Sequence, residues 1–535
     1  MPTLRSLLIR AQRIAADRRN CHQVERVEAY LRQVPAAMGD SARPVLFFNA
    51  STRIHRPSLN AAYSLLASWV VRAAGVPVRY VVCTRGLDPC VLGTNRDQYD
   101  EAPPCKPCMR LSRVLFAQDL VLPIGLNVEA AQAAGDQLGG LSMAALEAWE
   151  FDSLPLGKLC LPGLRWALRR HHLPDDEPTR GLFRRYLRSA ASLARQFDAI
   201  LEMENPRALV VFNGIMYPEA VARELALQRG IRVVTHEVGL RPYSAFFSHG
   251  HATFREVNLP EGHELSAEDE GRLDAYLAER FRGKFTMAGI RFWPEMEPLP
   301  ASLLEAIARH RQMAVVFTNV VFDTSQVHAN AVYPDMFAWL DDLRQVVAEN
   351  PDTLFVFRAH PDEDRAGKES RESVSQWAAE RGVALLPNAT FYGPSDYVSS
   401  YDLIRGAKLV LVYNSSIGLE ASIMGAPVLC AGRARYTQLP VVYFPRSREA
   451  YLVQLQEMLR APTIEVPAEF AANARRFLDF ELNSASLDLS WFLEPYPQAP
   501  GMVMFRRFAA QGLASSMGLA VIRRGILEDK DFTLW

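Results

Sequence analysis

The chain has 535 residues, of which 49% are hydrophobic and 22% charged, and its formal net charge at pH 7 is -1. This length exceeds what one hydrophobic core usually serves, so we expect two domains. The near-neutral charge argues against nucleic acid as a main partner, and no stretch is apolar for long enough to span a membrane.

The N-terminal segment predicts a basic helix. Apolar residues fall on one helical face and arginines crowd the rest, whereas the apolar core of a secretion signal is lacking. We therefore expect a cytoplasmic protein whose first helix either packs on its own domain or lies on the inner face of the membrane. The run at 501–524 has the same character.

Strand and helix patterns alternate through the first half of the chain. Residues 42–52 predict a buried strand with a polar end, 59–75 a helix and 76–83 a second strand. Residues 205–239 repeat this order. Two strand–helix–strand units indicate a parallel sheet, and we assign 1–258 to an N-terminal Rossmann-like domain.

Four of the seven cysteines cluster after the second of these strands, within 83–108. They are Cys83, Cys90, Cys105 and Cys108. A C-x2-C pair joined by a second pair can complete a tetrahedral zinc shell, and disulfides are disfavoured in the cytosol. A structural zinc ion is the leading interpretation, with unliganded thiols, an iron–sulfur cluster or a redox disulfide as alternatives.

The pattern changes near residue 259. Residues 259–311 combine a charged helix with a proline-bearing connection, and we interpret them as a linker. Alternation resumes over 312–445, which predicts a second Rossmann-like domain, and 446–535 predicts helices that pack back on the first domain. The fold class expected is α/β, with two such domains and flanking terminal helices.

Ligands of such sheets bind at the carboxyl ends of strands. The stretch FVFRAHP ends a predicted strand with Arg358, His360 and Pro361. Arginine can pair with phosphate oxygens and histidine can donate to the same group. The alternative is a histidine whose hydrogen bonds are satisfied at the end of the strand.

A second polar loop joins the strand before Asn414 to a helix of small residues. The helix would begin after Ser415 and Ser416, with Gly418 allowing close approach to the sheet and Glu420 one turn in. Unpaired N–H groups and serine hydroxyls would bind phosphate, and the carboxylate of Glu420 would accept ribose hydroxyls. Simple capping of a helix would use the same residues.

RAHP followed by YNSSIGLEASIMGAPVLCAG resembles the donor-binding half of GT-B glycosyltransferases of the bacterial capsule-polysaccharide type. The motifs are also similar to those of bacterial sialyl-, polysialyl- and Kdo transferases. The resemblance implies that His360 and Pro361, together with Ser415 and Ser416, hold the phosphate and cytidine of a CMP-sugar. It further implies two domains facing across a cleft.

The expected general base departs from the pattern of those families, in which two adjacent acids precede a glycine and one of them is the base. The nearest stretch here is THEVG, so Glu237 or His236 could act as the base, and Asp323 is a candidate on the opposite wall. A polar pair bonded to backbone is the alternative for the first two. Acceptor contacts are expected from a loop after the first strand, formed by Ser51, Thr52, Arg53 and His55; capping of a helix would explain the first two equally well.

The predicted function is transfer of a sugar from a nucleotide-activated donor to a surface polysaccharide or another glycan, which could be lipid-linked. A CMP-linked acidic sugar is preferred over a UDP-sugar. No metal is expected in catalysis, because helix and side-chain donors would stabilise the leaving phosphate. The alternatives are an enzyme like the UDP-sugar 2-epimerases, which share this architecture, and a non-catalytic scaffold of a polysaccharide assembly complex.

Overall fold

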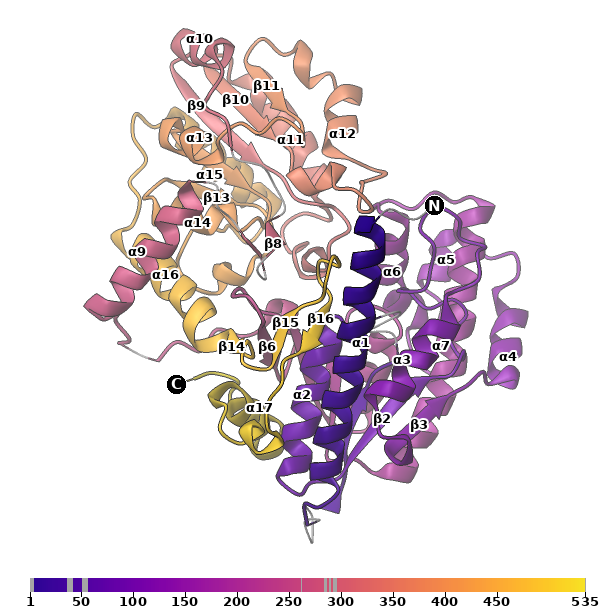
Figure 1. Cartoon of the computed structure of the whole chain (residues 1–535). Helices are drawn as coiled ribbons and strands as arrows, with labels where there is room; N and C mark the ends of the chain where they lie inside the picture. Colours follow the sequence, from indigo (N-terminus) through magenta and orange to yellow (C-terminus); the bar gives the residue numbers. More distant parts are fainter. Residues whose placement is uncertain are drawn as a thin grey trace.

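The computed structural model describes residues 4–35, 42–50, 56–260, 262–282, 286–287, 290–291 and 296–534. Within these residues the chain forms two α/β domains, each built on its own sheet (Figure 1). The predicted fold class, two Rossmann-like domains, is confirmed.

The N-terminal sheet has the strand order β14-β6-β5-β4-β1-β2-β3, and β1 to β5 run parallel. Taken in chain order, the parallel part reads 3-2-1-4-5, which is the Rossmann arrangement with its crevice between β1 and β4. Strands β6 and β14 extend one edge in antiparallel pairing. The strands are β1 (Val45–Phe48), β2 (Val78–Cys83), β3 (Val121–Ile124), β4 (Ala208–Phe212), β5 (Arg232–Val238), β6 (Ser244–Ser248) and β14 (Leu487–Asp488).

Helices cover both faces of this sheet because its strands are apolar on both sides. One face packs against α1 (Leu4–Leu31), α2 (Leu59–Ala73) and α17 (Met517–Glu528). The other packs against α4 (Val128–Leu138), α6 (Leu156–Leu168), α7 (Glu177–Glu204) and α8 (Glu219–Gln228). Shorter elements of this domain are α3 (Cys105–Leu115), α5 (Met143–Glu147), β15 (Leu493–Pro495) and β16 (Val503–Phe505).

The C-terminal sheet is parallel throughout, with the order β11-β10-β9-β12-β13. In chain order this again reads 3-2-1-4-5, so the crevice lies between the ends of β9 and β12. The strands are β9 (Gln312–Phe317), β10 (Thr353–Arg358), β11 (Ala389–Tyr392), β12 (Leu409–Val412) and β13 (Val428–Cys430).

Among the described residues, eight helices supply residues to the core on the two faces of this sheet. Helices α11 (Met336–Glu349), α12 (Val374–Glu380) and α15 (Arg448–Arg460) contribute to the core of one face. The core of the other receives residues from α9 (Ala267–Phe281), α10 (Ala301–Arg309), α13 (Ser400–Gly406) and α16 (Ala468–Asp479), and from the short α14 (Ile417–Ile423).

The structure places the boundaries of this domain differently from the expectation. Helices α9 and α10, expected within the linker 259–311, belong to its core, and so do α15 and α16 from the segment expected to return to the first domain. The chain from β14 onward joins the N-terminal domain, through β14, β16 and α17. Two short strands, β7 (Thr286–Met287) and β8 (Ile290–Arg291), pair with each other.

The chain therefore crosses between the domains twice, once after β6 and once at the π-helix η8 (Phe480–Ala485). Arg255 on the first crossing forms an ion pair with Glu481 on the second, and their side chains are only 5% and 1% exposed. The Nη1 atom of Arg435 lies 2.9 Å from the other oxygen of Glu481. The two crossings are thus joined by a buried carboxylate between two arginines.

Short 3-10 helices are η2 (Gln118–Leu120), η3 (Ala252–Phe254), η4 (Thr324–His328), η5 (Pro361–Asp364), η6 (Val383–Leu385), η7 (Arg435–Gln438) and η9 (Ala510–Leu513).

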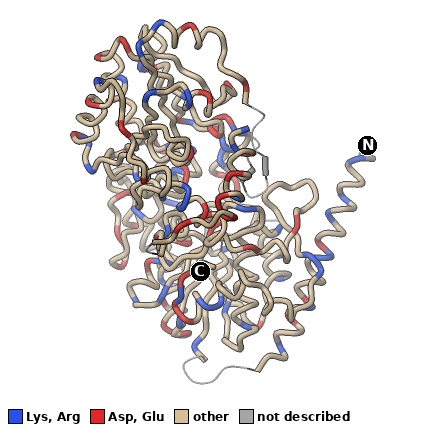
Figure 2. Tube along the Cα trace, turned by 90° about the vertical axis from the view of Figure 1, so that its left-hand side faces the viewer, with Lys and Arg blue, Asp and Glu red and all other residues tan. Residues whose placement is uncertain are grey.

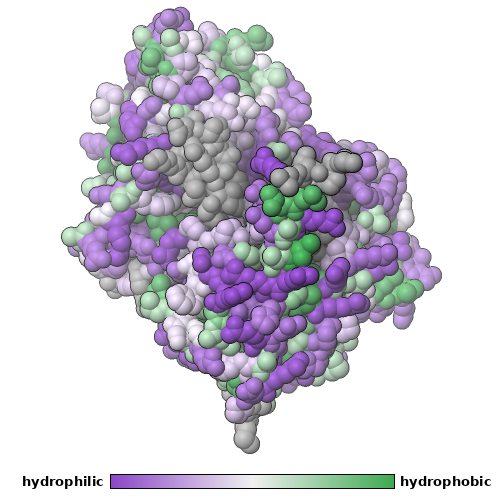
Figure 3. All heavy atoms as spheres, in the orientation of Figure 1, coloured by the Kyte–Doolittle hydropathy of each residue, from purple (hydrophilic) through white to green (hydrophobic). Residues whose placement is uncertain are grey.

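The N-terminal end of α1 projects from the body of the molecule (Figure 2). Leu7, Leu8 and Ile14 are exposed, and hydrophobic atoms are visible along this part of the surface in Figure 3. The C-terminal half of α1 packs on its own domain through Val24 and Val27. Among the described residues, no helix is both long and apolar enough to cross a bilayer.

Candidate active site between the two domains

Polar side chains meet at the crevice of the C-terminal sheet. The amide of Asn319, after β9, donates to the Oδ1 atom of Asn414, after β12, over 2.7 Å. Gln326 donates to the same oxygen over 3.0 Å. Because these residues follow the two central strands, their hydrogen bonds hold the two loops of the crevice together. Asn319 and Gln326 were not predicted, since their partner lies about 90 residues further along the chain.

His360 follows β10, the neighbour of β9, and is half-buried. Its Nδ1 atom accepts the backbone N–H of Asp362 over 3.1 Å. Burial lowers the pKa of His360, so the ring is neutral at pH 7 and its proton resides on Nε2. The ring can therefore act as a hydrogen-bond donor through Nε2.

The two serines begin α14 without capping it. Ser416 is exposed and its side chain forms no capping hydrogen bond, so its hydroxyl is not used by the helix. Ser415 is buried, and its carbonyl accepts the hydroxyl of Tyr436 over 2.7 Å. Gly418 is required here, because a Cβ atom would lie 2.5 Å from that hydroxyl. The packing of Tyr436 thus positions the serine loop.

Two residues that were expected to contact the sugar nucleotide have protein partners in the structure. Glu420 is 3% exposed, and its Oε1 accepts from the Nε and Nη2 of Arg280 over 2.8 and 2.5 Å. Its Oε2 accepts the hydroxyl of Tyr401 over 2.5 Å. Arg358 is also buried and donates to the carbonyls of Ala359 and Gly393. Both side chains stabilise the domain itself, which argues against the expected contacts of Glu420 with ribose and of Arg358 with phosphate.

An acidic triplet directly after Pro361 was overlooked in the sequence. Asp362 lies 3.4 Å from Arg365, whereas Asp364 accepts from Ser395 over 3.3 Å. Glu363 is buried, accepts the N–H of Val374, and has a pKa raised to about 8 by burial. The three carboxyl groups therefore make separate contacts and do not converge on one point.

Glu237 lies at the end of β5, facing hydrogen-bond donors of the N-terminal crevice. Its Oε1 accepts from the Nδ2 of Asn60 over 3.2 Å and from the N–H of Val238 over 2.8 Å. Its Oε2 accepts from the Nδ2 of Asn213 over 3.2 Å. All three donors are neutral. Burial raises the pKa of Glu237, and the negative charge of Asp323 adds to the effect.

His236 does not share this position, and its prediction as a base is wrong. Consecutive strand residues point to opposite faces of a sheet. The ring of His236 is buried between Phe212 and Phe247, at centroid distances of 5.9 and 5.4 Å. Burial lowers its pKa to about 3. It is therefore a neutral core residue.

Asp323 belongs to the opposite domain and is exposed. It caps η4 by accepting the hydroxyl and N–H of Ser325. Its negative charge adds to the raised pKa of Glu237 and opposes the lowering of the pKa of His360. An interdomain cavity of about 210 Å³ opens beside it. The lining residues include Lys158, Arg165, His171 and Met216 from the first domain and Phe322, Asp323 and Gln326 from the second.

Ion pairs join the domains next to this cavity. The Nδ1 of His172 lies 2.6 Å from Glu372, and its Nε2 lies 3.4 Å from Asp335. Hydrogen bonds to these two carboxylates raise the pKa of His172 to about 10. Atoms of His171, His172 and Asp335 lie within 4.8 Å of one another, as in a metal site. Because each ring nitrogen of His172 already faces a carboxylate, we interpret the group as an interdomain ion pair.

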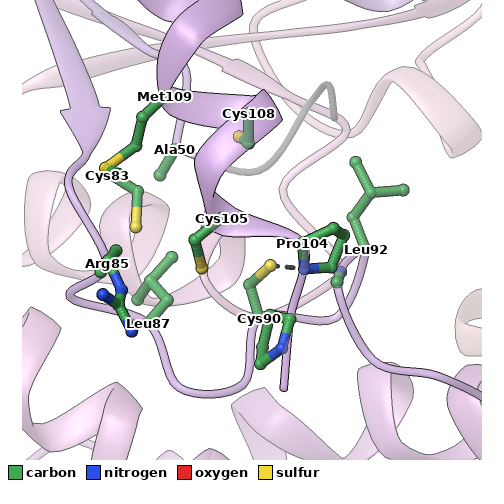
Figure 4. A pocket seen from close by; sticks show the side chains of 12 residues that line it. Ala50, Cys83, Arg85, Leu87, Cys90, Leu92, Pro104, Cys105, Cys108 and Met109 are labelled. Carbon is green, nitrogen blue, oxygen red and sulfur yellow. Dashed lines mark hydrogen bonds between the residues drawn. The ribbon is translucent and has the colours of Figure 1, made fainter. Parts of the chain in front are cut away.

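The expected acceptor residues Ser51, Thr52, Arg53 and His55 lie outside the described residues. The four cysteines of the predicted metal site line one cavity, drawn in Figure 4. It lies in the N-terminal domain at the end of β2, beside Ala50.

Residues 301–443 match the family model described as capsule polysaccharide biosynthesis protein. The match covers about a quarter of the chain and includes His360, Ser415 and Ser416. The predicted resemblance to the capsule-polysaccharide type is therefore confirmed over this region. None of the curated proteins compared with the chain matches it.

Solved structures of transferases and of an epimerase are similar to this chain. The KpsC beta Kdo 2,4 transferase of Thermosulfurimonas dismutans has 13% identity over 53% of this chain and 81% of its own, with a TM-score of 0.35. The beta Kdo 2,7 transferase of the same KpsC has 16% identity over 60% and 87%, with a TM-score of 0.34. A putative UDP-N-acetylglucosamine 2-epimerase from Listeria monocytogenes has 13% identity over 92% and 98%, with a TM-score of 0.28.

Proposed function

We propose that this chain is a glycosyltransferase of capsule polysaccharide biosynthesis that takes its sugar from a CMP-activated acidic donor. The observation that carries the proposal is a Rossmann-like crevice in each domain, with polar side chains where the strands of both sheets end. His360 and Ser416 follow strands of the C-terminal sheet, whereas Glu237 lies at the end of β5 in the N-terminal sheet.

The donor phosphate would bind at the C-terminal crevice. The Nε2–H group of His360 and the hydroxyl of Ser416, which does not cap the helix, are neutral hydrogen-bond donors. Asn414 is held in place by its hydrogen bond with Asn319. Such donors stabilise the charge that develops on a leaving phosphate. We propose that they do so without a divalent metal.

Two cationic side chains that line the interdomain cavity favour a donor sugar that carries a carboxylate. Lys158 and Arg165 line its N-terminal wall, and neither forms an ion pair in the part of the chain that the structure describes. A carboxylate of the donor sugar would pair with these cations in a partly desolvated site, where such pairs are strongest. This is the reason for preferring a CMP-linked acidic sugar over a neutral UDP-sugar.

Glu237 would act as the general base. Its carboxylate would take the proton of an acceptor hydroxyl as that oxygen attacks the sugar carbon, while the nucleotide leaves towards His360. A raised pKa makes a carboxylate a better proton acceptor. A base on the wall opposite the leaving group corresponds to a transfer with inversion of configuration.

The acceptor is proposed to be a growing capsule glycan on a lipid carrier. Support comes from the projecting end of α1, where Leu7, Leu8 and Ile14 are exposed among arginines. Apolar and cationic side chains together favour binding to an anionic bilayer surface. Sedimentation with anionic and with neutral vesicles tests this part separately.

The donor site is tested by thermal denaturation with CMP, CDP, UDP, GDP or no nucleotide. A ligand at a hundred times its dissociation constant stabilises the fold by about 2.7 kcal/mol. We expect CMP to raise the melting temperature most, and His360→Ala to abolish that rise. His310→Ala is the matched control, because His310 precedes β9 and so lies at the amino end of that strand, opposite to the crevice.

Other outcomes decide between the alternatives. Stabilisation by UDP alone would contradict the cytidine preference and restore the UDP-sugar transferases and 2-epimerases. The absence of any shift, together with no release of nucleotide from CMP-sugars, would favour a scaffold. Turnover should persist in EDTA; its loss would contradict metal independence.

A further inference from the structure

The cysteine arm, residues 84–104, leaves the end of β2 and returns at the start of α3. Cys83 is the last residue of β2 and Cys105 the first of α3, so a cysteine stands at each end of the arm. Cys90 lies within the arm and Cys108 one turn into α3. Three separate chain segments therefore bring the four thiols to one place.

The four thiols line a small cavity (Figure 4). Its volume of about 20 Å³ exceeds the roughly 10–15 Å³ that one water molecule needs, but it cannot hold a sugar. The N–H of Gly93 donates to the Sγ atom of Cys90 over 3.2 Å, and a Cβ at Gly93 would lie 2.9 Å from that sulfur. The loop is thus folded closely around a sulfur that accepts a hydrogen bond.

The surroundings suit a negatively charged centre. Arg85 lines the same cavity as the four thiols. A divalent metal with four thiolates carries net negative charge, which a neighbouring guanidinium offsets. By contrast, the cysteines outside the cluster are dispersed: Cys160 and Cys430 are buried in different domains, and Cys21 is on α1.

We propose that Cys83, Cys90, Cys105 and Cys108 bind a metal centre through four thiolates, which closes the base of the cysteine arm. Zinc and an iron–sulfur cluster share this ligand set. Zn–S bonds of about 2.3 Å place the sulfurs of a zinc tetrahedron about 3.8 Å apart. Among the described residues, the group with ligand atoms within 4.8 Å of one another is His171, His172 and Asp335, so the sulfurs are more widely spaced. Binding of a zinc ion would therefore draw the sulfurs closer together.

The centre would act on the active site through the arm, whose tip contacts the second domain. Arg96 donates to the carbonyl of Gly367 over 3.0 Å. Arg371 donates to Asp97 and to the hydroxyl of Tyr99 over 2.9 and 2.6 Å. A closed base keeps these three arm residues in position. The metal centre therefore has an architectural role in holding the domains together.

The test begins with wild-type protein purified with and without oxygen. Metal content is measured by mass spectrometry, acid-labile sulfide by colorimetry, and the visible spectrum is recorded. An iron–sulfur cluster gives a brown protein with iron and sulfide, whereas zinc gives a colourless protein with one ion per chain. Either result supports a four-thiolate centre.

Variants locate the metal. Cys105→Ser and Cys108→Ser should lose it, whereas Cys21→Ser, the control, should retain it. If the variants do not fold, an organomercurial titration of wild type replaces them, and metal release should be complete when the four thiols have reacted. Trypsin should cleave after Arg96 faster once the metal is removed.

The proposal is overturned if protein from both preparations contains no stoichiometric metal and takes up neither zinc nor iron with sulfide. Retention of metal by Cys105→Ser and Cys108→Ser would overturn it as well. Unchanged cleavage after Arg96 would contradict the role in holding the arm. None of these outcomes depends on the proposed glycosyl transfer.

Discussion

Replacing Glu237 with glutamine tests the proposed general base most directly. The substitution keeps the shape of the side chain and the two hydrogen bonds to Oε1. It removes the negative charge and places an NH2 group where Oε2 accepted from Asn213. Asn213 cannot compensate by turning its amide, because its Oδ1 already accepts the N–H of Ile215 over 3.0 Å.

The substitution should affect the folding free energy and the turnover rate by different amounts. One donor facing another in a buried site costs about 1–3 kcal/mol of folding free energy. Loss of a general base lowers turnover by about 10²- to 10⁴-fold, which corresponds to about 2.7–5.4 kcal/mol of activation free energy. Binding of CMP should stay unchanged, because Glu237 lies in the other domain.

The assay measures release of nucleotide from the sugar donor in the presence of acceptor, together with CMP affinity. Asp323→Asn provides the comparison. Removing its charge lowers the raised pKa of Glu237, so the acidic limb of the pH–rate profile should move to lower pH while the plateau stays. A fall of less than tenfold in Glu237→Gln would refute the reasoning. A collapse of the plateau in Asp323→Asn would assign the base to Asp323.

Three further substitutions probe the framework of the site. Glu420→Gln leaves Arg280 buried without a carboxylate and should lower stability by about 3–5 kcal/mol in urea denaturation; a loss below 1 kcal/mol would contradict a buried pair. His172 has a pKa raised to about 10 from 6.5, so its contribution to stability is complete below about pH 6.5 and is lost as the pH rises through 10. The melting-temperature difference between wild type and His172→Gln should shrink over that range, and a constant difference would exclude the ion pair as its cause. Gly418→Ala should weaken CMP binding by displacing Tyr436 from the serine loop, whereas Gly271→Ala, at an open position on α9, should not.

The sheets could be predicted because parallel strands are buried on both faces. Runs such as ALVVF and LVLV at β4 and β12 are apolar throughout and stand out from their surroundings. Domain boundaries were harder, since a charged helix such as α9 buries only a narrow stripe. Leu273 and Leu277 of α9 are buried in the second domain, and two such residues do not reveal which core receives them.

Side-chain roles could be predicted where they follow from local geometry and not where partners are distant. Strand alternation alone separates His236 from Glu237, and applying it to THEVG would have removed the histidine from the candidates. The partner of Glu420 is Arg280, 140 residues away, and no local pattern indicates that pair. Likewise, Asn60 and Asn213 become neighbours of Glu237 only when three strands and a helix are assembled.

The double crossing between the domains restricts how they can move. Two bodies joined by a single linker can both bend and rotate about it, whereas two links side by side leave bending about the line between them as the easiest motion. The ion pair between Arg255 and Glu481 connects the two crossings, so the line through them is the hinge axis of the two domains. We therefore expect the cleft to open and close with one degree of freedom, which would bring Glu237 and His360 back into the same register after each release of product.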